Sequence, residues 1–386
     1  MRVLIAPDCF TGTLTATQAA EAMAQGWRDG APHDELDQLP LSDGGPGFVD
    51  VLHGAMGGDL VTVTVSDPLG REVPAAFLLT HGDEPTAYVE SAAACGLHLL
   101  AADERDPGIT STYGVGQLVL AALESGARRI VVGLGGSGTN DGGAGLLAAL
   151  GAGAESDLAR GGLALAALDD HALPGLAGAR ERLRGVDLVL ATDVDNPLLG
   201  LQGASATFAP QKGADPATAQ ALEAALGRFT EVVARTMTAP MDLLTGRPRR
   251  LDKEAGAGAA GGLGYGLVVL GGRRVSGVQL VLDAVGVDAR LGRADLVVTG
   301  EGSFDWQSLH GKAAVGLTER ALAAAVPVVV VAGQVLVGRR ETRGLGISGT
   351  YAVAETPDQV ALAMADPVGT LRERVARIAR TWSPAR

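Results

Sequence analysis

The sequence predicts an α/β protein of two domains, one of them discontinuous. At 386 residues the chain exceeds the roughly 250 to 300 residues at which a single hydrophobic core stops growing. Apolar β-branched runs that end in glycines and acids alternate with helical segments, which is typical of parallel sheets flanked by helices. We expect a discontinuous Rossmann-like parallel-sheet domain (1–66 plus 286–386), an inserted α/β domain (67–285), and an active site in the cleft between them.

Composition limits the possible partners. Hydrophobic residues make up 47% and charged residues 19%, as in globular proteins. A net charge of −13 disfavours nucleic acid and anionic membranes, and 3% aromatic residues disfavour stacking on single strands. The longest apolar run, 326–332, is far shorter than the roughly 20 residues of a membrane span, and Pro7 comes too early for a signal peptide. We therefore expect a cytoplasmic monomer or homodimer without a membrane or nucleic-acid partner.

The chain opens with a strand and a helix, half of a doubly wound unit. Residues 3–6 are apolar and are followed by Asp8, which then faces the usual ligand crevice. Thr15 and Gln18 form a capping-box signature for a helix that buries Ala20, Met23 and Trp27. Cys9 is interpreted as a small buried residue and not a nucleophile, because no histidine pattern accompanies it.

Three further elements precede the main glycine-rich motif. Residues 39–45 form a second strand end that carries an acid and two glycines, with Asp43 and Gly44 as candidate site residues. Residues 61–65 alternate apolar residues with threonine and predict a half-exposed strand near a domain border. Residues 114–125 predict a helix that leads into the motif.

Residues 130–145 (IVVGLGGSGTNDGGAG) combine an apolar strand with a loop of seven glycines. The exposed N–H groups of such a loop suit an anion, with phosphate as the first candidate. An aspartate in a phosphate loop repels the ligand unless a cation lies between them, so a metal-bridged phosphate is the hypothesis. The candidate binding residues are Gly135, Gly136, Ser137, Thr139, Asn140 and Asp141.

Two other interpretations of this loop stay open. Gly133 to Gly138 formally match G-x-G-x-x-G after a strand, which would suit a nicotinamide dinucleotide. The same pattern occurs at 256–261 without a strand before it, and residues 139–143 interrupt the direct entry into a helix that a dinucleotide loop requires. A purely structural glycine turn is the remaining alternative.

Polar residues also follow the next apolar run. Residues 186–191 predict a strand that ends before Asp193, Asp195 and Asn196, and Gln211 and Lys212 come shortly after. A helical periodicity covers residues 222–237. A second glycine cluster then follows over 254–264, with no strand before it.

The last third of the chain returns to the pattern of an open parallel sheet. Three β-rich runs, 295–299, 326–332 and 349–353, are separated by helical segments. The first run ends in a glycine-rich stretch over 300–305. Its polar candidates, with those just beyond it, are Glu301, Asp305, Gln307 and Lys312.

The candidate residues together favour magnesium and phosphate chemistry. The sequence contains neither a P-loop nor a metal-binding histidine spacing. Instead, acidic residues lie at the ends of strands or in glycine-rich loops, and their carboxylate oxygens are hard ligands that suit Mg²⁺. Any single one of these acids could also simply cap a turn. Only three lysines occur, each beside a polar motif, and an ammonium group is a good partner for a transferring phosphoryl group.

Six blocks spread over nearly the whole chain are distinctive: APDCFTGTLTA (6–16), LSDGGPG (41–47), GLGGSGTNDGGAGLLAALGA (133–152), ATDVDNPLLGLQGASATFAPQKGAD (191–215), GAGAAGGLGYGL (256–267) and DLVVTGEGSFDWQSLHGKA (295–313). Through these blocks the chain resembles the bacterial glycerate kinases that form 2-phosphoglycerate. The resemblance implies ATP-dependent phosphorylation of D-glycerate, with ATP and Mg²⁺ as cofactors, by the two-domain fold expected above.

The resemblance implies roles for these residues. Asp193 is the hypothetical base, with Asp195 or Asp305 as its rival, and Lys312 completes the catalytic set. Glu301 and Asp305 would bind Mg²⁺, and Gly135 to Asn140 with Lys312 would hold phosphates, while backbone N–H groups or a cation would take the glycerate carboxylate. The remaining candidates for substrate or phosphate are Asp8, Asp43, Gly44, Asp141, Asn196, Gln211, Lys212 and Gln307.

The chain departs from the family pattern in two places. Where the family commonly has PDSFKGS, this chain has Cys9, Thr11 and Thr13, so the first loop lacks a lysine. Trp306 replaces a glycine commonly seen after Asp305. These changes concern the substrate more than the phosphoryl transfer. A NAD(P)-dependent oxidoreductase of a small 2-hydroxy acid and a non-catalytic binding protein are the alternative functions.

Overall fold

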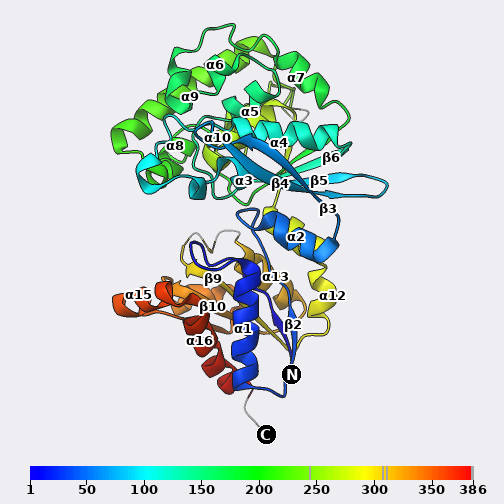
Figure 1. The fold of residues 1–386 in the computed structure, drawn as a ribbon, viewed down its shortest axis with the longest axis vertical. Helices are drawn as coiled ribbons and strands as arrows, with labels where there is room; N and C mark the ends of the chain where they lie inside the picture. Colours follow the sequence, from blue (N-terminus) through cyan, green and yellow to red (C-terminus); the bar gives the residue numbers. More distant parts are fainter. Residues whose placement is uncertain (243–244, 307, 310–311, 384–386) are drawn as a thin grey trace. The chain divides into compact units, whose positions relative to one another are not determined.

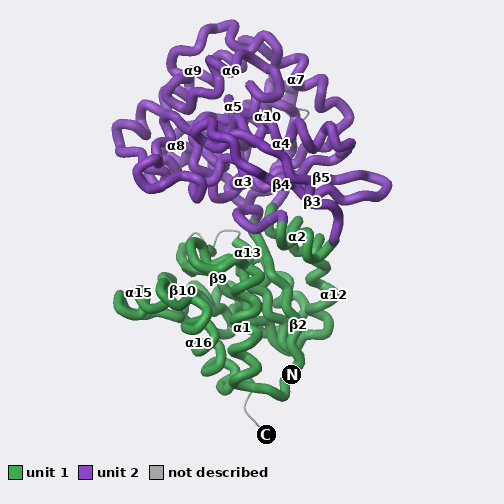
Figure 2. Tube along the Cα trace, in the orientation of Figure 1, with its two compact units in different colours: residues 1–43, 50–56, 277–386 green, residues 44–49, 57–276 purple. Residues whose placement is uncertain are grey.

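The computed structural model describes residues 1–242, 245–306, 308–309 and 312–383, which form two compact units (Figure 2). The first unit comprises residues 1–43, 50–56 and 277–386, and the second comprises 44–49 and 57–276. These boundaries differ from those expected at 66/67 and 285/286. Residues 59–66 pair with the sheet of the second unit, and residues 277–284 form a helix that packs in the first.

The first unit contains a parallel sheet with the strand order β11-β10-β9-β1-β2 (Figure 1). The chain passes from β1 to β2 on one side and from β9 through β10 to β11 on the other, which makes the sheet doubly wound. The strands are β1 (Arg2–Ile5), β2 (Glu35–Gln38), β9 (Leu296–Phe304), β10 (Val328–Val335) and β11 (Gly349–Ala352).

Helices cover both faces of this sheet. On one face α1 and α16 pack together over Val3, Ile5 and Val298, and on the other α13 covers Phe304 and Val330. The helices named in this unit are α1 (Ala16–Gly30), α11 (Gly277–Ala284), α12 (Val287–Leu291), α13 (Ala313–Ala323), α14 (Arg339–Gly344), α15 (Pro357–Ala365) and α16 (Pro367–Trp382), while α2 (Phe48–Met56) begins in the second unit's first segment and continues in the first unit.

Local signals in the sequence explain how these elements begin and end. Thr15 Oγ1 accepts from the Gln18 N–H and Gln18 Oε1 accepts from the Thr15 N–H, so the predicted capping box of α1 is present. The stretch from Gly300 to Phe304 was expected as a loop but continues β9, paired with Val331 to Val335 of β10. Gly300 permits this pairing, because an added Cβ would lie 2.1 Å from the Val331 carbonyl oxygen.

The second unit contains a six-stranded mixed sheet with the order β3-β4-β5-β6-β7-β8. The first three strands pair antiparallel and the last four parallel, so polar residues from four strand ends meet at one edge. The strands are β3 (Asp59–Ser66), β4 (Glu72–Thr80), β5 (Thr86–Glu90), β6 (Arg129–Gly133), β7 (Asp187–Ala191) and β8 (Arg273–Val275).

Short helices and one long helix complete the second unit. The predicted helices over 114–125 and 222–237 are confirmed as α4 (Tyr113–Glu124) and α9 (Pro216–Thr236). The others are α3 (Ala92–Cys95), α5 (Ala144–Ala149), α6 (Glu155–Leu158), α7 (Leu176–Arg182), α8 (Ala204–Phe208) and α10 (Ala259–Val269), with 3₁₀ turns η1 (Leu97–Leu99), η2 (Ala102–Glu104), η3 (Gly162–Ala167), η4 (Pro210–Lys212) and η5 (Leu251–Lys253). The α/β class expected from the sequence is thus confirmed.

A membrane-spanning helix is not found in the described part of the chain, where every helix is too short or too polar to cross a bilayer.

Candidate functional site

Three predicted acids and one predicted lysine are brought together in the first unit. Asp8 follows β1, Asp43 follows β2, and Glu301 lies on β9 with its Oε2 3.2 Å from Lys312 Nζ. Asp43 interacts electrostatically with both Asp8 and Glu301. Because β1 and β9 flank the point where the strand order reverses, this cluster occupies the usual ligand position of a doubly wound sheet.

Asp8 and Glu301 are buried, Asp43 is half-buried, and the three acids repel one another. Burial and then Asp43 raise the pKa of Asp8 well above its usual value, against the Cys9 N–H that donates to Asp8 Oδ1 at 2.6 Å. Burial also raises the pKa of Glu301, although Lys312 opposes this shift. Glu301 Oε1 is buried without a hydrogen-bond partner among the described residues. Such a cluster gains stability from a further cation.

Lys312 and Asp305 complete this group. Burial disfavours the charge on Lys312, but Glu301, Asp43 and Asp305 together outweigh burial and raise the pKa of the ammonium group. Asp305 follows the end of β9, and its Oδ1 accepts from the Ser308 N–H at 3.2 Å. Within the described ranges no three His, Cys, Asp or Glu side chains are arranged to hold a metal. A cation here would therefore have one or two carboxylate ligands, which is usual for Mg²⁺.

The neighbouring departures from the family pattern lie at the surface of the first unit. Thr11 is exposed, and its Oγ1 lies 3.9 Å from Cys9 Sγ. Cys9 is half-buried, and burial followed by the charge of Asp8 raises its pKa to about 12, which agrees with the prediction that it is not a nucleophile. The side chain of Trp306 is 60% exposed.

In the second unit the glycine-rich loop runs from Leu134 to Gly143, between β6 and α5. Close packing requires several of its glycines: an added Cβ on Gly135 would lie 2.5 Å from Gly45 Cα. The N–H groups of Gly135, Gly136 and Ser137 donate to none of the described residues. Gly136 adopts a positive φ of 67°, which suits glycine, and consecutive N–H groups without a described partner are a candidate site for an anion.

Lys212 is brought to this loop from 3₁₀ turn η4. Its Nζ donates to Ser137 Oγ at 2.9 Å and to the Thr139 carbonyl oxygen at 2.6 Å. The lysine is only 2% exposed, and burial lowers its pKa to about 8. The ammonium group thus supports the loop from inside the unit. It does not project from the surface as a phosphate-binding lysine would.

Asp141 is fully buried and is bound by groups of its own unit. Its carboxylate accepts from the N–H groups of Thr112, Gly143 and Gly145 and from the Thr112 hydroxyl, at 2.8 to 3.1 Å. Burial raises its pKa, while these donors oppose the shift. The expected bridging metal is therefore not needed to stabilise the Asp141 carboxylate, because Thr112, Gly143 and Gly145 supply its donors.

Asp193 and Asp195 follow β7 but have different surroundings. Asp193 is half-buried, and its Oδ1 accepts from Ser276 Oγ at 2.5 Å. The side chain of Asp195 is 77% exposed and forms an ion pair with Arg274 at 2.8 Å. Arg274 Nε also donates to the Thr192 carbonyl oxygen at 3.1 Å. Asp193 is thus oriented by a neighbouring side chain inside the unit, whereas Asp195 lies at the surface.

The remaining predicted residues have varied positions. Asn140 Nδ2 donates to Ser205 Oγ at 3.0 Å, and Asn196 Nδ2 donates to the Gln202 carbonyl oxygen at 2.7 Å. Gln211 is exposed next to Lys212. Gly44 lies in the second unit with a φ of 94°, near the Ala191 carbonyl oxygen. Gln307 lies outside the described residues.

Three side chains that form hydrogen bonds or ion pairs with predicted site residues were not identified from the sequence. Ser276 follows the end of β8, so the strand-end rule that selected Asp193 could have selected it as well. Arg274 lies within the same short strand. Thr112, the main partner of Asp141, lies 29 residues earlier in the chain and carries no local signal that could have identified it.

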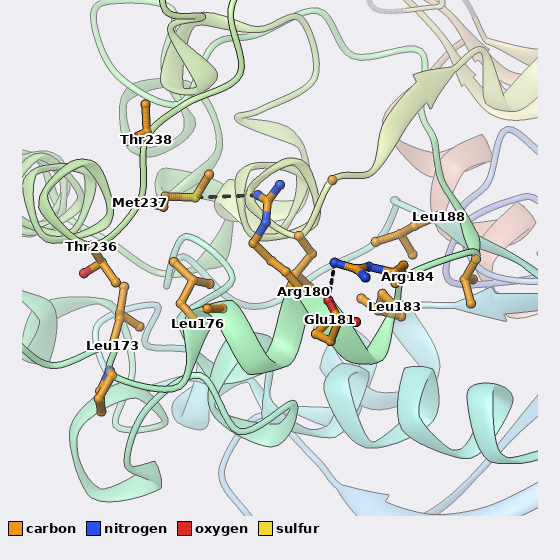
Figure 3. A pocket seen from close by; sticks show the side chains of 15 residues that line it. Leu173, Leu176, Arg180, Glu181, Leu183, Arg184, Leu188, Thr236, Met237 and Thr238 are labelled. Atoms are coloured by element: carbon orange, nitrogen blue, oxygen red, sulfur yellow. Dashed lines mark hydrogen bonds and ion pairs between the residues drawn. The ribbon is translucent and has the colours of Figure 1, made fainter.

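A separate pocket of about 570 Å³ lies in the second unit against α7 (Figure 3). Its two arginines are already paired: Arg180 Nη1 donates to Met237 Sδ at 3.6 Å and Arg184 contacts Glu181 at 2.7 Å. The pocket also borders the start of β7 at Leu188, the opposite end from Asp193, and none of the predicted site residues lines it.

Comparison with known proteins gives a consistent result. The model of the glycerate kinase family matches residues 3–383. The chain is 40% identical to the glycerate kinase of Bacillus subtilis (strain 168) and 37% identical to the glycerate 2-kinase of Escherichia coli (strain K12), each over 358 residues, 92% of this chain and 90% of the relative. A crystal structure from Salmonella typhimurium LT2, assigned as a glycerate kinase 2, has a TM-score of 0.73 at 37% identity and covers 99% of this chain and 98% of that one.

The nicotinamide alternative finds no support in the loop or in these relatives. Helix α5 begins at Ala144, six residues beyond the Gly133 to Gly138 pattern, so the loop does not run directly into a helix as a dinucleotide turn does. The relatives compared above that carry a function in their names are kinases. With a family match over nearly the whole chain, we conclude that the chain belongs to the glycerate kinase family and is a phosphotransferase.

Proposed function

We propose that the protein transfers the γ-phosphoryl group of ATP to D-glycerate and forms 2-phospho-D-glycerate, with Mg²⁺. The Escherichia coli relative named glycerate 2-kinase supports the choice of product. In this step the substrate hydroxyl oxygen bonds to the γ-phosphorus, the bond from that phosphorus to the bridging oxygen of ADP breaks, and the hydroxyl proton passes to a base. Such transfer depends mainly on positioning and on neutralising charge.

The observation that carries the proposal is the cluster of Asp8, Asp43, Glu301 and Lys312, in which Asp8 and Glu301 are buried. Two buried acids with raised pKa values, and a Glu301 Oε1 that has no partner among the described residues, suit a hard divalent cation. Glu301 and Asp305 remain the two proposed Mg²⁺ ligands. The bound ion would neutralise charge on phosphate oxygens. The charged ammonium group of Lys312 would hold the same phosphates from the side of Glu301.

Asp193 is the proposed general base. The bond from Ser276 Oγ fixes the orientation of its carboxylate, which would accept the hydroxyl proton. Asp195 is a weaker candidate because Arg274 already pairs with it at the surface. The unpaired N–H groups of Gly135 to Ser137 would take an anionic group, either the carboxylate of glycerate or a phosphate.

The reaction is tested with an enzyme-coupled assay that measures the rate of ADP release in the presence of ATP, D-glycerate and Mg²⁺. We expect turnover that EDTA abolishes and added Mg²⁺ restores, and phosphorus NMR should assign the product as the 2-phosphate. ADP release with another hydroxy acid but not with D-glycerate would refute the substrate. A 3-phosphate product would refute the proposed position of transfer.

The base is tested by Asp193→Asn, with Asp195→Asn as the matched variant two residues away. Loss of a general base costs about 10² to 10⁴ in kcat, so Asp193→Asn should lose activity on this scale and keep its affinity for ATP. Asp195→Asn should stay within a few-fold of wild type. Near-normal turnover in Asp193→Asn would remove that residue from the role.

We further propose that the protein acts in the cytoplasm on small anionic substrates. Its net charge of −13 and low aromatic content support this preference over nucleic acid or a membrane surface.

A further inference from the structure

Within the described part of the chain four strands form the edges of the two sheets, and β3 differs from the other three. Strands β2 and β11 have four residues each and β8 has three, and β2 and β8 also carry charged side chains. Short length and charge are the usual protection of a sheet edge against pairing with another chain. Strand β3 (Figure 1) has eight residues, and its only charge is Asp59 at its start, so this edge lacks such protection.

The hydrogen bonds at the end of β3 show which of its backbone groups point outward. The Asp67 N–H donates toward the β4 side, to the Arg71 carbonyl oxygen at 2.7 Å. The Ser66 N–H donates away from β4, to Gln117 Oε1 at 2.7 Å. Backbone groups of successive residues point to alternate sides in an antiparallel pair. Three residues of β3 therefore direct their N–H and C=O groups outward, away from β4: Leu60, Thr62 and Thr64.

These outward groups are free and accessible. They have no hydrogen-bond partner among the described residues, and β4 is the strand with which β3 pairs. The side chain of Leu60 is 44% exposed, and those of Thr62 and Thr64 are exposed as well. On the opposite face Val61 and Val63 pack against the core of the second unit, which fixes β3 in place. A further strand can therefore pair with β3 without rearranging it.

A second copy of the chain fits this edge because β3 is complementary to itself in an antiparallel arrangement. With a two-fold axis at Thr62, this residue faces Thr62 of the second copy, and Leu60 faces Thr64. Each facing pair exchanges two hydrogen bonds, so the three pairs form about six and use every outward group. An axis at Val61 leaves Thr64 facing a residue before the strand. An axis at Val63 makes Leu60 face residue 66, whose N–H is already bonded.

We propose that the protein forms a homodimer in which the β3 strands of two copies pair antiparallel about a two-fold axis at Thr62. The two six-stranded sheets then become one continuous sheet. In this register Val61 faces Val63 of the other copy, and such β-branched pairs stabilise sheets. Asp59 faces Val65, so no like charges oppose each other. Two-fold symmetry of this kind is the commonest arrangement among protein oligomers.

Sedimentation velocity on the intact protein tests the dimer. An interface made by one strand edge is small, so we expect a dissociation constant on the order of 1 to 100 µM. The wild type should convert from monomer to dimer as its concentration is raised across this range. A protein that stays monomeric up to about 300 µM, beyond this range, would overturn the proposal.

Thr62→Lys tests whether β3 forms the interface. The exposed position leaves the core intact, but the variant places two positive charges opposite each other at the axis, which should weaken the dimer about tenfold or more. Gln38→Lys, at an exposed position of the β2 edge, is the control and should dimerise as the wild type does. An equal mixture of Thr62→Lys and Thr62→Asp should recover the dimer, because opposite charges then face each other. A dimer that Thr62→Lys retains, or a mixture that stays monomeric, would overturn the proposal.

Thr62→Cys tests the register, with Leu60→Cys as the matched variant. Facing residues in a hydrogen-bonded pair have Cα atoms about 5.5 Å apart, which suits a disulfide. The two copies of residue 60 would lie about 14 Å apart, four residues along the strands, which is too far. Copper–phenanthroline oxidation should therefore link the subunits of Thr62→Cys and leave Leu60→Cys and the wild type unlinked on a non-reducing gel. Linkage of Leu60→Cys that is as fast as that of Thr62→Cys would overturn the proposed register.

Discussion

Replacing Lys212 by methionine should change how the stability of the protein depends on pH. The lysine is buried, and its pKa falls from a usual 10.5 to about 8. At about 1.4 kcal/mol for each pH unit, this lowering corresponds to about 3 kcal/mol by which burial disfavours the charged form. Methionine is of similar length and carries no charge, so the variant lacks this pH-dependent cost.

The direction of the effect follows from proton counts. Between pH 8 and 10.5 the folded protein has released the Lys212 proton, while the unfolded chain still holds it. Stability rises with pH wherever the unfolded state binds more protons, so the wild type should gain about 3 kcal/mol of unfolding free energy relative to Lys212→Met across this range. The variant also leaves the Thr139 carbonyl oxygen without its donor, but this loss does not vary with pH.

Urea denaturation at several pH values, followed by far-ultraviolet circular dichroism, measures this difference. Tryptophan fluorescence is unsuitable because Trp27, Trp306 and Trp382 all belong to the first unit, whereas Lys212 belongs to the second. Lys253→Met serves as the control and should show no such slope relative to wild type. A difference between wild type and Lys212→Met that is flat or falls from pH 8 to 10.5 would refute the reasoning.

Two further predictions concern other parts of the structure. Gly261→Ala should destabilise the second unit by about 2 kcal/mol or more, since its φ is 68° and the new Cβ would lie 1.9 Å from the Thr139 carbonyl oxygen. Gly178→Ala is the control, because this glycine lies in helix α7 with open space around it. It should leave the free energy of unfolding in the same urea assay unchanged or raise it by up to about 1 kcal/mol. An equal loss of unfolding free energy in both variants would contradict the steric argument. Cys9 and Cys95 should react slowly with a thiol reagent in the native protein at pH 8, because burial raises both pKa values to about 12. Rapid labelling of either cysteine in the native protein would show that its thiolate is more accessible than the structure indicates.

Much of the fold could be predicted because its signals are local. The capping box of Thr15 and Gln18 and the apolar runs that became β1, β7 and β10 depend only on neighbouring residues. The continuation of β9 through Gly300 to Phe304 could not be predicted in the same way. It depends on pairing with β10, and this tertiary pairing overrides the low strand propensity of glycine.

Those residues of the candidate site that come directly after the end of a strand could be predicted from the sequence. This rule selected Asp8, Asp43 and Glu301, which the first unit brings together. It could not show that Lys212 lies inside the second unit, because its contact with Ser137 spans 75 residues. The rule also treated Asp141 as a ligand of a metal-bridged phosphate, whereas its carboxylate is bonded to the backbone of its own loop.

The packing of α1 against α16 has a consequence for the order of folding. These are the first and the last helix of the described chain, and they approach so closely that an added Cβ on Gly26 would lie 2.3 Å from the Arg372 carbonyl oxygen. Domains generally fold as units while the chain is synthesised. Almost all of the second unit leaves the ribosome as the continuous segment 57–276, so it can fold early, whereas the first unit must wait for its final helix.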